Sequence, residues 1–162
     1  MGEGVSIVVD LSDFARVADV VTRLGAFDAS ELMSSIGALG ESQTRRRITD
    51  EKSAPDGTPW PANRAGTPIL VKSGEHLLAS IAWTSSGDQA EWGAAWEYAH
   101  VHQNGMTITP KTAKALRFPI AGGAFAVAKQ VSIPARPFIG LSDANIAEIT
   151  MVVTDVFGAV LS

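Results

Sequence analysis

The segment Ile133-Pro134-Ala135-Arg136-Pro137-Phe138-Ile139-Gly140-Leu141-Ser142 decides the fold of the C-terminal part of this 162-residue chain. Its two prolines restrict the backbone to extended conformations, so the segment predicts a stiff corner. Ser142 is a favourable N-cap residue, and the apolar residues after it recur at helical spacing. We therefore expect a C-terminal helix over residues 142–161. Its apolar positions are Ile146, Ile149, Val153, Val156 and Val160.

Upstream of this corner the sequence alternates between β-type runs and turn signals. Residues 81–85 and 91–96 predict two strands around Ser86-Gly87-Asp88, and residues 115–120 and 124–131 predict two more around Gly122-Gly123. Ile133 is expected to continue the last of these strands. Aromatic residues favour strands, so we expect Trp83, Trp92 and Trp96 to be buried by sheet packing.

The N-terminal half is mainly helical in pattern. Residues 5–9 are rich in β-branched residues and predict a first strand. Helices are expected from Ser12 or Asp13 to Gly25 and from Ser30 to about Ile48, with a further short helix after Ser73. The chain is thus interpreted as one α+β domain over residues 1–162. Its expected architecture is a small antiparallel or mixed β-sheet with N-terminal helices, and the long C-terminal helix packed on that sheet.

Residues 53–72 predict a long loop rich in proline and glycine. Pro55-Asp56-Gly57 is a turn signal, because proline presets φ and glycine accepts positive φ. Trp60 lies between Pro59 and Pro61 in this loop. A large aromatic in a stiff segment either pins the loop to the protein or serves as an anchor for a partner, and both interpretations stay open.

Composition excludes several classes of protein. Hydrophobic residues make up 46% of the chain and charged residues 19%, which is too apolar for an intrinsically disordered protein. The chain has no cysteine, which excludes disulfide frameworks and thiolate metal sites. Its net charge of −4 argues against a surface for duplex DNA. The sequence shows no signal peptide and no membrane helix of about 18 uninterrupted apolar residues, so we expect a cytoplasmic protein with no membrane partner.

Residues with catalytic or metal-binding chemistry are few. His76, Glu97, His100 and His102 could form a zinc or iron site, which gives the alternative hypothesis of a metal-dependent enzyme or small-ligand-binding protein. Zinc sites usually have better-defined ligand spacing, and no nucleophile or phosphate-binding motif is present. We therefore expect no enzyme activity and no cofactor.

A run of three arginines, Arg45, Arg46 and Arg47, is the one candidate contact for nucleic-acid phosphate. Asp50 and Glu51 follow it directly, and the net charge is negative. The preferred interpretation is a solvated, charged helix end.

Five motifs, in this order and at these separations, carry a family resemblance. They are Gln43-Thr44-Arg45-Arg46-Arg47-Ile48, Pro55-Asp56-Gly57-Thr58-Pro59-Trp60, Ile69-Leu70-Val71-Lys72-Ser73-Gly74, Tyr98-Ala99-His100-Val101-His102-Gln103-Asn104-Gly105 and the segment 133–142. Together they resemble the phage virion morphogenesis family of the Mu type, which includes tail-completion proteins. The family has no catalytic requirement.

The resemblance implies an assembly role, in which a ring of identical subunits, hexameric by analogy with tail symmetry, completes or terminates a tail or joins tail to head. Tail tube, neck or head-completion proteins are the implied partners, and the implied location is the virion, with assembly in the bacterial cytoplasm. Rings use heterologous contacts, and aromatic and arginine anchors dominate interface energetics. For the segment around Arg136, an anchor between the last helix and the sheet is an equally good interpretation. The candidate interface residues are Trp60, Tyr98, His102, Gln103, Arg136, Pro137 and Phe138.

Overall fold

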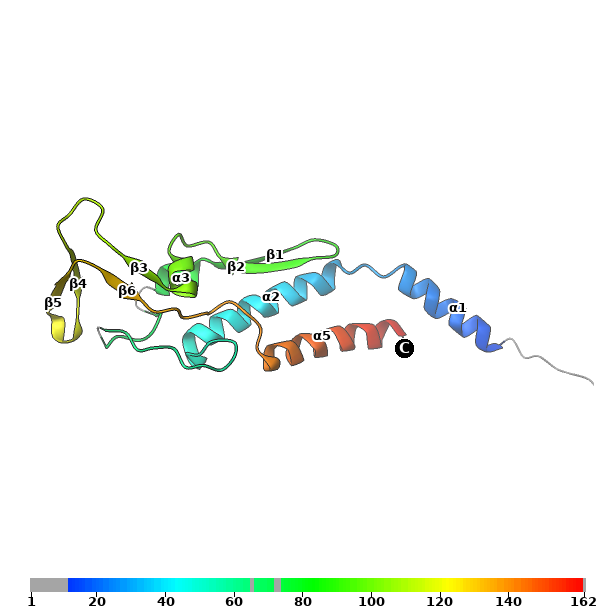
Figure 1. The fold of residues 1–162 in the computed structure, drawn as a ribbon. Coiled ribbons are helices and arrows are strands. Elements are labelled where there is room, and N and C mark those ends of the chain that lie inside the picture. The colour runs from blue at the N-terminus through cyan, green and yellow to red at the C-terminus, as the bar shows by residue number, and fades with distance from the viewer. Residues whose placement is uncertain (1–11, 65, 72–73, 162) are drawn as a thin grey trace, which may run out of the picture.

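A single long helix, α2 (Ser30–Arg46), is the centre of the fold (Figure 1). The computed structural model describes residues 12–64, 66–71 and 74–161, so the strand expected at residues 5–9 lies outside the described residues. The Asp28 carboxylate accepts a hydrogen bond from the Ser30 amide at 2.9 Å at the start of α2. The helix continues into a π-helical turn, η1 (Arg47–Glu51), and ends at Lys52, which has a left-handed φ of 54°.

The first hairpin lies along one side of α2. Strands β1 (Ile81–Ser85) and β2 (Ala90–Ala94) pair antiparallel as predicted, with Trp83 opposite Trp92. Gly37 and Gly40 lie under these two indoles. A Cβ at Gly37 would lie 2.6 Å from the Trp83 ring, and a Cβ at Gly40 would lie 2.4 Å from the Trp92 ring. The tryptophans therefore pack on helix α2, where the absence of two side chains makes room for them. Trp83 remains exposed, and Trp92 and Trp96 are half-buried, so the expected full burial of these three by sheet packing is wrong.

The remaining strands form two further hairpin-like pairs, so the structure has three two-stranded antiparallel sheets in its described residues where one sheet was expected. Strand β4 (Leu116–Pro119) pairs with β5 (Phe125–Ala128), as the turn signal indicates. The predicted continuation to Ile133 is wrong. Strand β6 (Val131–Ile133) pairs instead with β3 (Met106–Ile108), which was not predicted.

Five other helical segments complete the described elements, and four of them come before the C-terminal helix. Helix α1 (Ser12–Gly25) has the predicted bounds, and α3 (Gly74–Ala79) follows Ser73. Helix α4 (Ala99–Asn104) ends at Gly105, whose φ is 72°. A Cβ there would lie 2.7 Å from the Ala135 amide nitrogen, so glycine allows the proline corner to approach α4 closely. A short 3-10 turn, η2 (Ala121–Gly123), joins β4 to β5.

The C-terminal helix α5 (Asp143–Leu161) begins as predicted after Ser142. The Ser142 hydroxyl accepts from the Asn145 amide, and the Asn145 side chain accepts from the Ser142 amide, both at 3.2 Å. This reciprocal cap stabilises the first turn. Helix α5 packs mainly against α2, on the side away from the β1–β2 hairpin, and makes a smaller contact with α1. The expectation that it packs on the sheet is therefore wrong.

Helix α5 is also rich in apolar residues. It is long and apolar enough, with a mean hydropathy of 1.5, to cross a membrane by length and composition alone. A search for about 18 uninterrupted apolar residues does not find this helix, because Asn145, Glu148 and Asp155 interrupt the run.

The hydrophobic core lies at the C-terminal end of α2, where η1, α3, the Trp60 loop and the proline corner meet. Ile48 and Leu77 are fully buried, and Phe138 is nearly so. The buried members of the core are Ile48, Ala54, Trp60, Leu70, Leu77, Ile81, Ala99 and Phe138.

Candidate functional site

The proline corner is held in place by the side chain of Gln103 on α4. Its Nε2 donates to the Ile139 carbonyl at 3.0 Å, and its Oε1 accepts from the amides of Phe138 and Ile139 at 2.9 and 3.1 Å. The Arg136 amide donates to the His102 carbonyl at 2.7 Å. Prolines prevent this segment from pairing as a regular strand, so the carboxamide supplies the missing hydrogen bonds.

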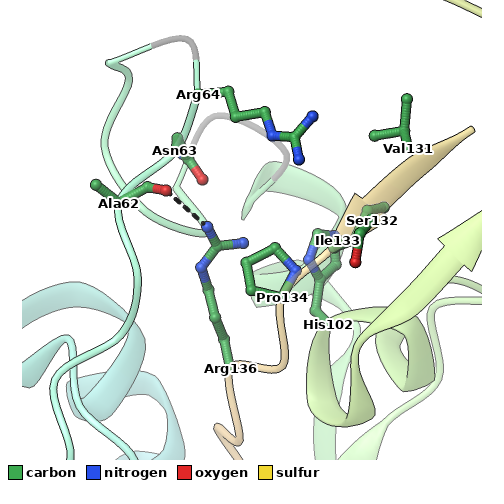
Figure 2. A pocket seen from close by; sticks show the side chains of 9 residues that line it. All are labelled: Ala62, Asn63, Arg64, His102, Val131, Ser132, Ile133, Pro134 and Arg136. Carbon is green, nitrogen blue, oxygen red and sulfur yellow. Dashed lines mark hydrogen bonds between the residues drawn. The ribbon is translucent and has the colours of Figure 1, made fainter. Parts of the chain in front are cut away.

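Arg136 fastens the Trp60 loop to this corner. Its Nε and Nη2 donate to the Pro61 carbonyl at 2.9 and 2.8 Å, and Nη2 also donates to the Ala62 carbonyl at 3.3 Å (Figure 2). In return the Trp60 indole Nε1 donates to the Pro137 carbonyl at 3.2 Å. Of the two interpretations of the loop, the structure supports the one in which Trp60 pins it to the protein.

This geometry corrects part of the predicted interface. Trp60 is 6% exposed, Arg136 4% and Phe138 1%, so these three side chains do not lie on the surface of the subunit. They are buried because the corner folds back over the loop that follows η1. His102, Gln103 and Pro137 are half-buried, and Tyr98 is exposed. Tyr98 is thus the candidate interface residue most accessible to a partner.

The three arginines at the end of α2 all bind other parts of the chain. Arg45 donates to the Leu78 and Ile81 carbonyls at 2.7 and 2.9 Å, and Arg46 pairs with Glu148 at 2.9 Å. Arg47 is fully buried, and its guanidinium donates to the Phe138 and Gly140 carbonyls and to the Asn145 side chain. The expectation of a solvated position is therefore wrong for Arg47, which is buried. The side chains of Arg45 and Arg46 are 38% and 42% exposed, so for them the nucleic-acid contact stays an untested alternative.

A polar network around Arg47 connects α2 to α5, and sequence reasoning did not find it. Gln43 is buried, and its Nε2 donates to the Asn145 carbonyl at 3.2 Å and to the Glu148 carboxylate at 2.8 Å. The hydrogen bond from Gln43, followed by the hydrogen bond and the charge of Arg46, lowers the pKa of Glu148. Gln43 lies in the first of the five motifs, but only contacts across the fold show that it bonds to α5.

A pocket of about 420 Å³ opens beside Arg136 (Figure 2). Arg64, His102 and Ser132 contribute polar side chains to its wall, and none of its lining residues is acidic. Arg136 Nη1 has no hydrogen-bond partner among the described residues, and neither has the buried Nδ1 of His102. Burial, and to a lesser extent the positive charge of Arg136, lower the pKa of His102, which keeps its imidazole neutral at pH 7. The pocket can therefore accept an anionic group such as a carboxylate.

The histidines of the metal hypothesis lie around a tryptophan. The Trp96 ring stacks with His102 at 5.6 Å and with His76 at 6.3 Å between ring centroids, and Tyr98 meets Trp96 edge-on at 5.5 Å. In the part of the chain that the structure describes, no three His, Asp or Glu residues come together as metal ligands. The predicted group of His76, Glu97, His100 and His102 is therefore not assembled here as a metal site.

The fold and this network define an α+β protein whose arginine and amide side chains bind its own main chain. The chain belongs to the phage virion morphogenesis family, whose sequence model matches residues 9–158. The resemblance carried by the five motifs is thus confirmed. Comparisons with the curated proteins and with the solved structures found no match.

Proposed function

We propose that this protein is a structural subunit of the virion that completes or terminates the phage tail, or joins the tail to the head, as a homo-oligomeric ring. Six copies are expected by analogy with tail symmetry. Its partners are then further copies of itself and proteins of the tail tube or neck. Assembly takes place in the cytoplasm of the bacterial host.

The observation that carries the proposal is the apolar character and the exposure of α5, the longest helix in the described part of this virion morphogenesis protein. The rest of the chain buries little of it. Asn145 is the only residue of α5 that is buried in the described chain. Monomeric proteins rarely leave large contiguous apolar patches in water, and such patches commonly mark protein–protein contacts. A subunit that is complete only in an assembly fits this pattern.

The proposal is tested by combining solution mass with a genetic deletion. Light scattering of the purified protein is expected to show an oligomer whose mass is a multiple of 17.0 kDa. Electron microscopy of lysates from a phage that lacks this gene is expected to show separate heads and tails, or tails of abnormal length. Normal, joined virions in these lysates would contradict the proposed function.

A further inference from the structure

The exposed side of α5 is mostly apolar, with Asp143 in its first turn and Asp155 near its C-terminal end as its exposed charges. Met151 is 61% exposed, and Ile146 and Leu161 are each 49% exposed. The hydroxyls of Thr150 and Thr154 both donate to the carbonyl four residues earlier, at 2.8 Å, so their bonding capacity as donors is used within the helix. Apart from the two aspartates, this face presents methyl and methylene groups, with the small residues Ala147 and Gly158 between them.

A second uncovered apolar face lies on α1. Val17 is 60% exposed, Val21 61% and Leu24 40%. Their spacing of four and then three residues places them in one stripe along the helix. In Figure 1, α1 extends from the end of α2 away from the rest of the fold, and its smaller contact with α5 leaves this stripe uncovered. The chain thus has two apolar helix faces that its own fold does not cover.

Helix α5 is acidic, whereas α1 carries two aspartates and two arginines. Helix α5 contains no lysine or arginine, and its acids Asp143 and Asp155 make no ion pair among the described residues. On α1, Arg23 pairs with Asp19 at 3.3 Å, whereas Arg16 has no acidic partner in the described part of the chain. Arg16 borders the valine stripe, where it can meet an acid on an opposing helix.

From these observations we infer that the Val17-Val21-Leu24 stripe of α1 in one copy docks on the outward face of α5 in the next copy. The inference rests on the proposed ring, because it names the contact between neighbouring subunits. A head-to-tail ring needs two different, complementary patches on each copy, and α1 and α5 supply such a pair. The new contact would continue the one that α1 and α5 already make within a chain. Beside it, the ring of Phe27, in the linker between α1 and α2, lies 5.2 Å from the ring of Phe157.

The absence of cysteine in this chain makes a disulfide test direct. Val21→Cys and Met151→Cys are prepared as separate full-length proteins, the second with a short tag, and are then mixed and mildly oxidised. Both positions are exposed, so neither substitution disturbs the core. The expected product is the mixed disulfide, in clear excess over either homodimer. A protein chain cannot form this mixed product with itself, so intramolecular α1–α5 contact does not confuse the result.

Thr22→Cys is the matched control, because it is exposed and follows Val21 but lies off the apolar stripe. Paired with Met151→Cys, it should give several-fold less mixed disulfide. If light scattering shows an oligomer but the Val21→Cys and Met151→Cys proteins give no excess of the mixed disulfide, the α1–α5 contact is wrong and the proposed ring is not contradicted. A monomer at every concentration with no disulfide product would overturn both. Binding of the monomer to phosphatidylglycerol vesicles through α5 would show a membrane as the occupant and would also overturn the inference.

Discussion

Replacement of Arg47 by methionine should destabilise the isolated subunit strongly, because this side chain joins η1 to the start of α5. Its guanidinium donates to the Phe138 carbonyl at 3.2 Å, to the Gly140 carbonyl at 2.6 Å and to the Asn145 side chain. Methionine keeps much of the volume but donates nothing. The two carbonyls would then lose the donor that Arg47 supplies, while the Asn145 oxygen keeps the Ser142 amide.

The size of this effect follows from the cost of leaving buried acceptors without donors. Each such group costs about 1–3 kcal/mol, so the two carbonyls together cost about 2–6 kcal/mol. Removing a buried charge recovers part of this, since burial already lowers the pKa of Arg47 and thus opposes its charged form. We expect a net loss of about 2–4 kcal/mol in the free energy of unfolding, which for a chain of this size lowers Tm by roughly 10 °C.

Arg46→Met is the matched control for this experiment. Arg46 is adjacent, but its side chain is 42% exposed and pairs with Glu148 and Glu51 at the surface. Exposed ion pairs contribute at most about 1 kcal/mol, so its Tm should fall by only a few degrees. Urea unfolding followed by circular dichroism gives both values. Equal stabilities for the two variants would refute the structural role assigned to Arg47.

Three further perturbations test the packing and the pocket. Gly40→Ala should destabilise by about 1–3 kcal/mol despite its better helix propensity, because its Cβ would lie 2.4 Å from Trp92. Gly158→Ala, with nothing within 4 Å of the new atom, should be neutral or stabilising, and urea titration compares the two. Trp60→Ala should cost about 3–5 kcal/mol in the isolated subunit, measured by thermal melting, and an unchanged Tm would contradict its place in the core. The lowered pKa of His102 means that the unfolded chain binds a proton that the folded chain does not. The free energy of unfolding therefore keeps the full contribution of neutral His102 above pH 6.5, the usual pKa of histidine. This contribution falls as the pH drops toward the lowered pKa of the folded protein. His102→Asn should flatten the pH dependence of stability in that range, and an unchanged slope would contradict this account.

Much of the secondary structure follows from local sequence. Ser142 begins α5, Gly25 ends α1, and Ser86-Gly87-Asp88 turns the β1–β2 hairpin, all as expected. These features depend on residues within a few positions of one another, so caps, turns and apolar periodicity are enough to predict them. Strand β3 escaped prediction because it has only three residues and its partner lies 25 residues further along the chain.

The roles of the candidate site residues did not follow in the same way. Arg136 can bond carbonyl groups wherever it lies, yet which carbonyls it reaches depends on the loop 75 residues earlier. Trp60 offered two opposite interpretations, and its hydrogen bond to Pro137 across 77 residues decides between them. Sequence shows which groups can donate or accept, whereas burial and partner identity depend on how distant segments meet.

The sequence by itself determined the α+β class, most helix and turn positions and membership of the virion morphogenesis family, because periodicity, capping and ordered motifs are properties of the linear chain. Only the tertiary structure decided that α5 packs on α2, that three arginines at one helix end serve the protein's own fold, and that α1 and α5 keep apolar faces uncovered. The physical reason is that desolvation and hydrogen-bond pairing depend on neighbours in space. For Arg47 those neighbours lie more than 90 residues away along the chain.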